Sequence, residues 1–130
     1  MQWDVLMEAA WRAREQAYAP YSKFAVGAAL FAVDGRIFAG CNVENLSYSL
    51  SICAERVALG AAVAAGAQQF LALAVVADTG VPISPCGACR QALAEFGVPR
   101  VILANRREWL EFTLAELLPR PSAGILDRPQ

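Results

Sequence analysis

The chain has 130 residues, enough for one domain with hardly room for a second. Its formal net charge is −1, so it has neither a strongly basic face for nucleic acid nor an acidic tail for a basic partner. Hydrophobic residues make up 57% of the chain and charged residues 18%, which argues against disorder and predicts apolar surface that subunit contacts cover.

The first part of the chain predicts a helix followed by a hairpin. Apolar residues recur at three- and four-residue steps over residues 3–18, as on the buried face of an amphipathic helix. A buried strand is predicted over residues 24–33. Asp34-Gly35 then predicts a tight turn and a return strand over residues 36–40.

The remainder alternates helices and strands. A polar, irregular stretch over residues 42–51 precedes a predicted helix over 52–66 and a nearly continuous apolar strand over 70–78. Ser84 and Pro85 predict an N-cap and a first-turn proline for a helix over 86–96. Strands over 101–104 and 109–113 and a short helix over 114–118 complete an α/β fold. We expect three α-β-α layers around a five-stranded mixed sheet, with parallel, right-handed strand-helix-strand crossovers.

Residues 1–119 are predicted to form a single domain and residues 120–130 a C-terminal tail with a loose end. The apolar stretch 57–77 predicts a buried helix and a buried strand rather than a membrane span, because it is mostly alanine and has Gln68 and Gln69 at its centre. The absence of a secretory signal sequence predicts a cytoplasmic protein with reduced thiols.

The sequence contains no histidine, which excludes Ser-His-Asp and Cys-His catalysis and any histidine metal ligand from this chain. A general base near neutral pH must therefore be another group, with a carboxylate of shifted pKa as the leading candidate.

Four cysteines carry the strongest chemical signal. Four thiols would fit two disulfides in a secreted protein, but in a reduced chain a Cys-x-x-Cys pattern indicates metal binding or redox chemistry. Cys53 and Cys86 each begin a predicted helix, where the helix dipole stabilises a thiolate. Cys89 follows Cys86 by one turn, so three thiols can bind one Zn²⁺ and leave the fourth position open to water, as in catalytic sites. Cys41 is interpreted as a small buried apolar residue.

Charged residues accompany these thiols. Glu55 lies two residues after Cys53, near enough to take a proton from water at the metal and pass it on. Three thiolates and one Zn²⁺ sum to −1, and Arg56, with Arg90 as a second candidate, is predicted to donate hydrogen bonds to the sulfurs. On the residues alone, a thioredoxin-like redox domain and a structural zinc module remain open. The first should lack the third thiol, and the second requires a fourth ligand.

The chain resembles the small zinc-dependent cytidine deaminases. The pattern Cys-Ala-Glu followed by Pro-Cys-x-x-Cys is typical of nucleoside deaminases. The segments that carry the closer resemblance are residues 17–24 (AYAPYSKF), 26–30 (VGAAL), 40–45 (GCNVEN) and 84–91 (SPCGACRQ). The resemblance extends over residues 9–119, nearly the whole predicted domain.

This resemblance implies hydrolysis of cytidine and 2′-deoxycytidine to the uridines plus ammonia, as in pyrimidine salvage. It implies one Zn²⁺ per chain on Cys53, Cys86 and Cys89, with Glu55 moving a proton from the attacking water to N3 and then assisting the departing amine. The implied substrate-binding residues are Phe24 against the base, Asn42 and Glu44 on the ribose, and Ala54. It also implies a homotetramer with active sites completed by neighbouring subunits. No nucleic-acid partner is expected without a basic channel, and no membrane partner is expected without a membrane span.

One feature departs from the family pattern. The family usually has a phenylalanine shortly after the position of Pro119, whereas this chain has no aromatic residue after Phe112. Ile125 and Leu126 are the only comparable apolar candidates. The runner-up substrate is a modified or aminoacylated cytosine nucleoside. The role of Tyr48, in the core or at an interface, stays open.

Overall fold

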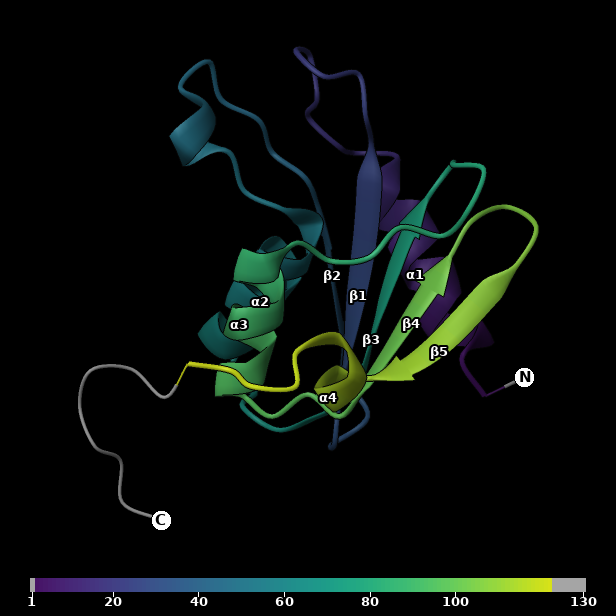
Figure 1. Ribbon diagram of the computed structural model, residues 1–130, viewed down its shortest axis with the longest axis vertical. Coiled ribbons are helices and arrows are strands. Elements are labelled where there is room, and N and C mark those ends of the chain that lie inside the picture. Colours follow the sequence, from purple (N-terminus) through teal and green to yellow (C-terminus); the bar gives the residue numbers. More distant parts are fainter. Residues whose placement is uncertain (1, 123–130) are drawn as a thin grey trace.

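A five-stranded sheet in the order β2-β1-β3-β4-β5 forms the centre of the fold (Figure 1). The computed structural model describes residues 2–122, so the predictions for the loose chain end, Ile125 and Leu126 lie outside the described residues. The strands are β1 (Val26–Ala32), β2 (Ile37–Cys41), β3 (Phe70–Ala77), β4 (Arg100–Ala104) and β5 (Trp109–Thr113). The helices are α1 (Asp4–Arg14), α2 (Ala54–Ala64), α3 (Gly87–Glu95) and α4 (Leu114–Leu117), with a 3₁₀ turn η1 at Tyr48–Leu50.

The sheet is mixed, as predicted. β1 pairs antiparallel with both β2 and β3, β3 pairs parallel with β4, and β5 pairs antiparallel with β4. β2 and β3 therefore run in the same direction with β1 between them, so both strand-helix-strand connections join parallel strands. The hairpin turn is also confirmed, with Gly35 at φ 94°, a conformation that glycine adopts without strain.

Helices cover both faces of the sheet. Figure 1 shows α1 on one face and α2 and α3 on the other, which confirms the three-layer arrangement. Successive residues of β3 contribute alternately to two separate core clusters. Leu73 and Val75 pack on the α2 side, and Ala74 and Val76 on the α1 side. This alternation explains the nearly continuous apolar sequence of β3, because both of its faces are buried.

The end predicted for the first helix was wrong, and the second helix begins near residue 52 as predicted. The first helix ends at Arg14 rather than at residue 18, and the second begins at Ala54. The Tyr18 N–H donates to the Asn42 carbonyl at 3.0 Å, and Val43 and Ile52 exchange two backbone hydrogen bonds at 2.9 and 2.8 Å. After Arg14 the backbone N–H groups of residues 15–17 donate to carbonyls three residues back, and at Tyr18 pairing with a distant segment replaces the helical hydrogen bond that local periodicity predicts.

The predicted cap of the third helix was also wrong. Cys86, not Ser84, is the N-cap of α3, with an extended backbone at φ −67° and ψ 169°. Pro85 precedes the helix and is fully buried. Hydrogen bonds to the carbonyls on either side of Cys86, described below, hold this residue in its extended conformation.

The segment 18–24 and the segment 42–52, which carries η1, project together beyond one end of the sheet (Figure 1). Among the helices within residues 2–122, none has both the length and the apolar content needed to cross a membrane.

Candidate metal centre and active site

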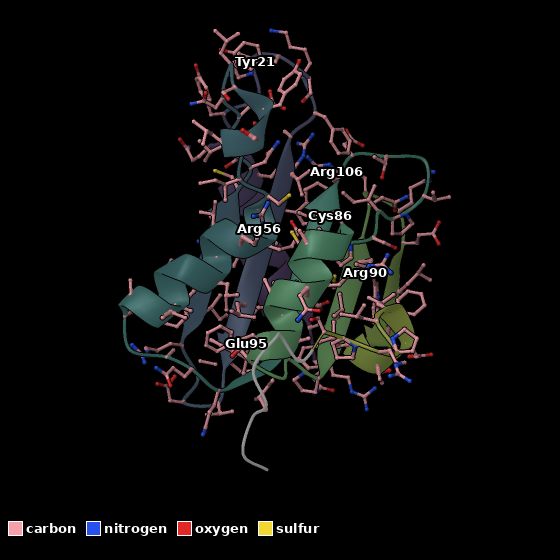
Figure 2. All side chains as sticks on the ribbon, turned by 60° about the vertical axis from the view of Figure 1, so that its left-hand side comes forward. Tyr21, Arg56, Cys86, Arg90, Glu95 and Arg106 are labelled. Atoms are coloured by element: carbon pink, nitrogen blue, oxygen red, sulfur yellow. The ribbon has the colours of Figure 1, made fainter. Side chains whose placement is uncertain are left out.

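The starts of α2 and α3 bring three cysteines together. Cys53 is the N-cap of α2, Cys86 is the N-cap of α3, and Cys89 lies in the first turn of α3. Figure 2 shows Arg56 and Cys86 at the adjoining ends of the two helices, where the sulfur atoms gather. The positive ends of two helix dipoles thus face one group of sulfurs, which favours thiolates.

The sulfur separations suit zinc. The Sγ atoms of Cys53 and Cys86 lie 3.9 Å apart and those of Cys86 and Cys89 lie 3.5 Å apart. Zn–S bonds of ~2.3 Å at tetrahedral angles separate two sulfurs by about 3.8 Å. All three Sγ atoms lie within 4.8 Å of one another, and within residues 2–122 this group has no fourth His, Cys, Asp or Glu member. The donor set therefore fits a zinc ion with one coordination position left open.

One thiol of this cluster, that of Cys53, has a lowered pKa that favours the thiolate. A hydrogen bond from the Cys89 thiol lowers the pKa of Cys53 to about 5, and hydrogen bonding from Arg56 adds to this effect. The same bond and burial raise the pKa of Cys89. Because zinc binds thiolates, the pair already holds the negative charge that the first metal-sulfur bond requires.

Glu55 lies in the first turn of α2 with a side chain that is only 5% exposed. Burial, assisted by the negative charge on Cys53, raises the pKa of this carboxyl to about 7. A carboxyl of this pKa can both accept and donate a proton near neutral pH, which is the property of a general acid-base group.

Gly40 allows α2 to lie directly on β2. A Cβ atom at this position would come within 2.7 Å of the Ala54 carbonyl oxygen and 2.5 Å of the Ala58 nitrogen. The spacing of residues in the sequence does not predict this role of Gly40. The feature that could indicate close packing at this point is a glycine near the end of the strand that precedes a buried helix.

The two arginines behave differently. Arg56 lies 3.7 Å from the Cys53 sulfur through Nη2, and this contact raises the pKa of its guanidinium. The guanidinium of Arg90 is instead directed to backbone carbonyls, those of Pro85 at 2.8 Å and Leu117 at 2.7 Å.

Asn42 and Glu44 organise the segment that leads into β1. The Asn42 amide donates to the Phe24 carbonyl at 2.7 Å and accepts from the Val26 N–H at 2.9 Å. Glu44 accepts from the N–H groups of Tyr21 and Ser22, each at 3.1 Å, and from the Ser22 hydroxyl.

Hydrogen bonds from Ser22 lower the pKa of Glu44, which therefore remains ionised at neutral pH. The Val43–Ile52 pairing brings this pair of polar residues beside the segment that enters Cys53. The Phe24 side chain is exposed.

The remaining candidates are placed as follows. Ala54 is fully buried at the start of α2. Tyr48 is exposed and makes an edge-to-face contact with Tyr21, with ring centroids 6.4 Å apart. Cys41 is a free, half-buried thiol and is not part of the three-sulfur group.

Known proteins are similar to this chain in sequence and in fold. The family model for the cytidine and deoxycytidylate deaminase zinc-binding region matches residues 1–105. A cytidine deaminase from Sporosarcina psychrophila is 60% identical over 111 residues, which cover 83% of this chain and 82% of that protein. The chain belongs to the cytidine deaminase family.

Solved structures agree with this assignment. The crystal structure of cytidine deaminase from Burkholderia pseudomallei is similar with a TM-score of 0.89 at 52% identity, covering 94% of this chain and 100% of that one. That of Mycobacterium tuberculosis gives a TM-score of 0.82 at 42% identity, covering 96% of this chain and 99% of that one. Cys53, Cys86 and Cys89 thus form the zinc-binding group of a cytidine deaminase fold, and the redox and structural-zinc alternatives are set aside.

Proposed function

We propose that the chain hydrolyses cytidine and 2′-deoxycytidine to uridine and 2′-deoxyuridine, consuming one water and releasing one ammonia per turnover. The observation that carries this proposal is the buried carboxyl of Glu55 beside three clustered thiols, in a chain of the cytidine deaminase family. An acid-base group next to a metal position with an open coordination site is the arrangement that hydrolytic deamination requires.

Glu55 is the proton carrier in this proposal. A zinc ion held by Cys53, Cys86 and Cys89 would supply the Lewis acid that makes water reactive toward C4 of the cytosine ring. Glu55 accepts the first proton of the attacking water and delivers it to N3. It then takes the second proton from the hydroxyl at C4 and passes it to the 4-amino group, so that the C4–N bond breaks, the C4 carbonyl forms and ammonia leaves. Its pKa of about 7 supports both directions of transfer, because neither protonation state is costly near neutral pH.

Arg56 limits the negative charge of the centre. Three thiolates and a divalent cation sum to −1, which is unfavourable beside the buried turn of α2. The contact of 3.7 Å from Arg56 Nη2 to the Cys53 sulfur supplies a compensating positive charge.

Substrate binding is assigned to the segments around β1 and α2. Phe24 contacts the cytosine ring, Asn42 and Glu44 bind the ribose hydroxyls, and Ala54 lines the base position. The ionised state of Glu44 supports its role as an acceptor for a ribose hydroxyl.

The active protein is proposed to be a homotetramer with shared active sites. Exposed large apolar residues gather on the two projecting segments: Tyr18, Tyr21, Phe24, Val43, Leu46, Tyr48, Leu50 and Ile52. Large apolar patches of this kind mark protein interfaces. The outer side of α2 presents Gly60, Ala61 and Ala64, which permit close approach of another helix.

Residues 1–119 are proposed to form the single catalytic domain. We further propose a cytoplasmic location. The four free thiols support a reducing compartment.

Ultraviolet absorbance distinguishes the substrate classes. The zinc-loaded protein is mixed separately with cytidine, deoxycytidine, cytosine, deoxycytidine monophosphate and adenosine, and the loss of the amino chromophore is followed. We expect turnover of the two cytosine nucleosides only. Absence of turnover with both would overturn the proposal and direct the search to modified or aminoacylated cytosine nucleosides.

A further inference from the structure

Arg90 fixes both peptide groups that flank Cys86. Its guanidinium Nε donates to the Pro85 carbonyl at 2.8 Å, and its backbone N–H donates to the Cys86 carbonyl at 3.0 Å. These carbonyls belong to the planar peptide groups before and after Cys86. Because one residue holds both peptide planes, the φ and ψ angles of Cys86 have little freedom. The backbone position from which the exposed Cys86 side chain extends is therefore fixed.

The other end of the guanidinium is anchored to the C-terminal part of the domain. Nη1 donates to the Leu117 carbonyl at 2.7 Å, at the last residue of α4, where a helix leaves its carbonyls without partners. Hydrogen bonds from a charged donor are about twice as strong as neutral ones. The α4 anchor is itself held by a capping box between Thr113 and Glu116 and by burial of Leu114.

The next residue adds a second tie to the same segment. The Gln91 side chain donates to the Ser122 carbonyl at 3.0 Å and accepts from the Ser122 N–H at 2.8 Å. Adjacent residues of α3 thus bind the chain at two points of its C-terminal segment. Figure 2 shows Arg90 partway along α3, below the Cys86 turn.

The start of α2 needs no such support. The carbonyl before Cys53 belongs to Ile52 and accepts from the Val43 backbone N–H at 2.9 Å. The residue in the position equivalent to Arg90 is Val57, whose backbone N–H donates to the Cys53 carbonyl at 3.1 Å but whose side chain cannot donate. Only the α3 start depends on a side chain for this contact.

We propose that Arg90 is a positioning residue for the metal centre. It joins the Pro85–Cys86 peptide to α4, with Gln91 in support, and the C-terminal segment thereby holds Cys86 in ligand geometry. This inference rests on the proposed zinc enzyme, and it assigns Arg90 to the backbone around a ligand rather than to a sulfur.

The test compares zinc release from Arg90→Lys and from the parent. A lysine keeps the charge but loses the planar fork that reaches two carbonyls. The matched control is Arg36→Lys, because Arg36 also donates to a helix carbonyl, that of Ala65 at 3.1 Å, but at the far end of α2. Zinc transfer to an excess of a chelating dye is timed. The absorption spectrum of the cobalt-substituted protein reports the ligand geometry independently of turnover.

We expect Arg90→Lys to release zinc roughly 10-fold faster than the parent, at the low end of the 10–100-fold range for outer partners of metal ligands. Its cobalt spectrum should shift, while Arg36→Lys matches the parent in both measurements. Parent-like release and spectrum in Arg90→Lys, or equal acceleration in Arg36→Lys, overturns the inference.

If Arg90→Lys does not fold, zinc release is measured on Gln91→Leu, which removes the two hydrogen bonds to Ser122. Faster zinc release from this variant supports the inference and parent-like release overturns it. A parent protein that binds no zinc overturns the proposed function and this inference together, whereas a zinc-binding parent with unaffected variants overturns the inference alone.

Discussion

The starts of α2 and α3 place a cysteine at the same helical position but are held in different ways. Cys53 and Cys86 are both N-caps with extended backbones, at ψ 151° and 169°. The peptide before Cys53 is held by backbone pairing with Val43, whereas the peptide before Cys86 is held by the Arg90 side chain. The same local geometry thus has a backbone support in one place and a side-chain support in the other.

Burial separates the two starts as well. Ala54 and Glu55 at the start of α2 are buried, and this burial raises the pKa of Glu55. Cys86 at the start of α3 is exposed. In the proposed function, the α3 start therefore contributes only ligands, whereas the α2 start combines one ligand with the proton transfer assigned to Glu55.

The largest effect is expected from removal of the ligands at the α3 start. A Cys86→Ala, Cys89→Ala double variant keeps only Cys53, which cannot hold zinc alone. Zinc content by elemental analysis should fall from about one per chain to none, and cytidine turnover should fall to background. A double variant that retains zinc would show that these thiols are not the ligands.

The next effect removes the proton chemistry at the α2 start and leaves the metal. Glu55→Gln preserves the size of the side chain but cannot accept a proton, so turnover should fall by about 10²–10⁴-fold. Zinc content should stay at the parent value, and cytidine should still bind in equilibrium dialysis. Loss of zinc would make Glu55 a ligand or its support, and near-normal turnover would mean that another base operates.

A smaller effect comes from moving the α2 start away from the sheet. Gly40→Ala forces a Cβ against the backbone of α2, and overpacking of this kind costs about 1–3 kcal/mol. The matched control is Gly27→Ala, whose Cβ would come within 2.0 Å of the Ala10 carbonyl of α1, on the opposite face from the zinc group.

Urea denaturation should show that both glycine variants are destabilised. Only Gly40→Ala should also release zinc faster and lose turnover per folded molecule, because α2 carries Cys53 and Glu55. Equal losses of turnover in the two variants would contradict a specific role for Gly40.

The smallest effect is expected at the thiol that belongs to neither helix start. Cys41→Ser should keep about one zinc per chain and parent-like turnover, because Cys41 lies outside the sulfur group. The free energy of unfolding should fall by about 1 kcal/mol, as is typical of single substitutions. A clear loss of zinc from this variant would place Cys41 in the metal centre.

Much of the candidate site could be predicted from the sequence because its residues lie near helix starts. Cys53 and Glu55 share one turn, Cys86 and Cys89 share another, and each spacing is local. The contacts of Arg90 could not be predicted, because Leu117 is 27 residues away and the choice between a sulfur and a carbonyl depends on how α4 packs. The same holds for Glu44 and Ser22, which are 22 residues apart.

The sequence by itself determined the order of helices and strands, the buried character of β3 and the three thiols with their acidic neighbour. These features depend on the periodicity of burial and on short spacings, which any fold of this chain must respect. Only the tertiary structure decided where α1 ends, which residue caps α3 and what Arg90 binds. The physical reason is that a backbone or guanidinium donor binds the acceptor that packing brings within reach, and Tyr18 with Asn42 and Arg90 with Leu117 are brought together only by the folded chain.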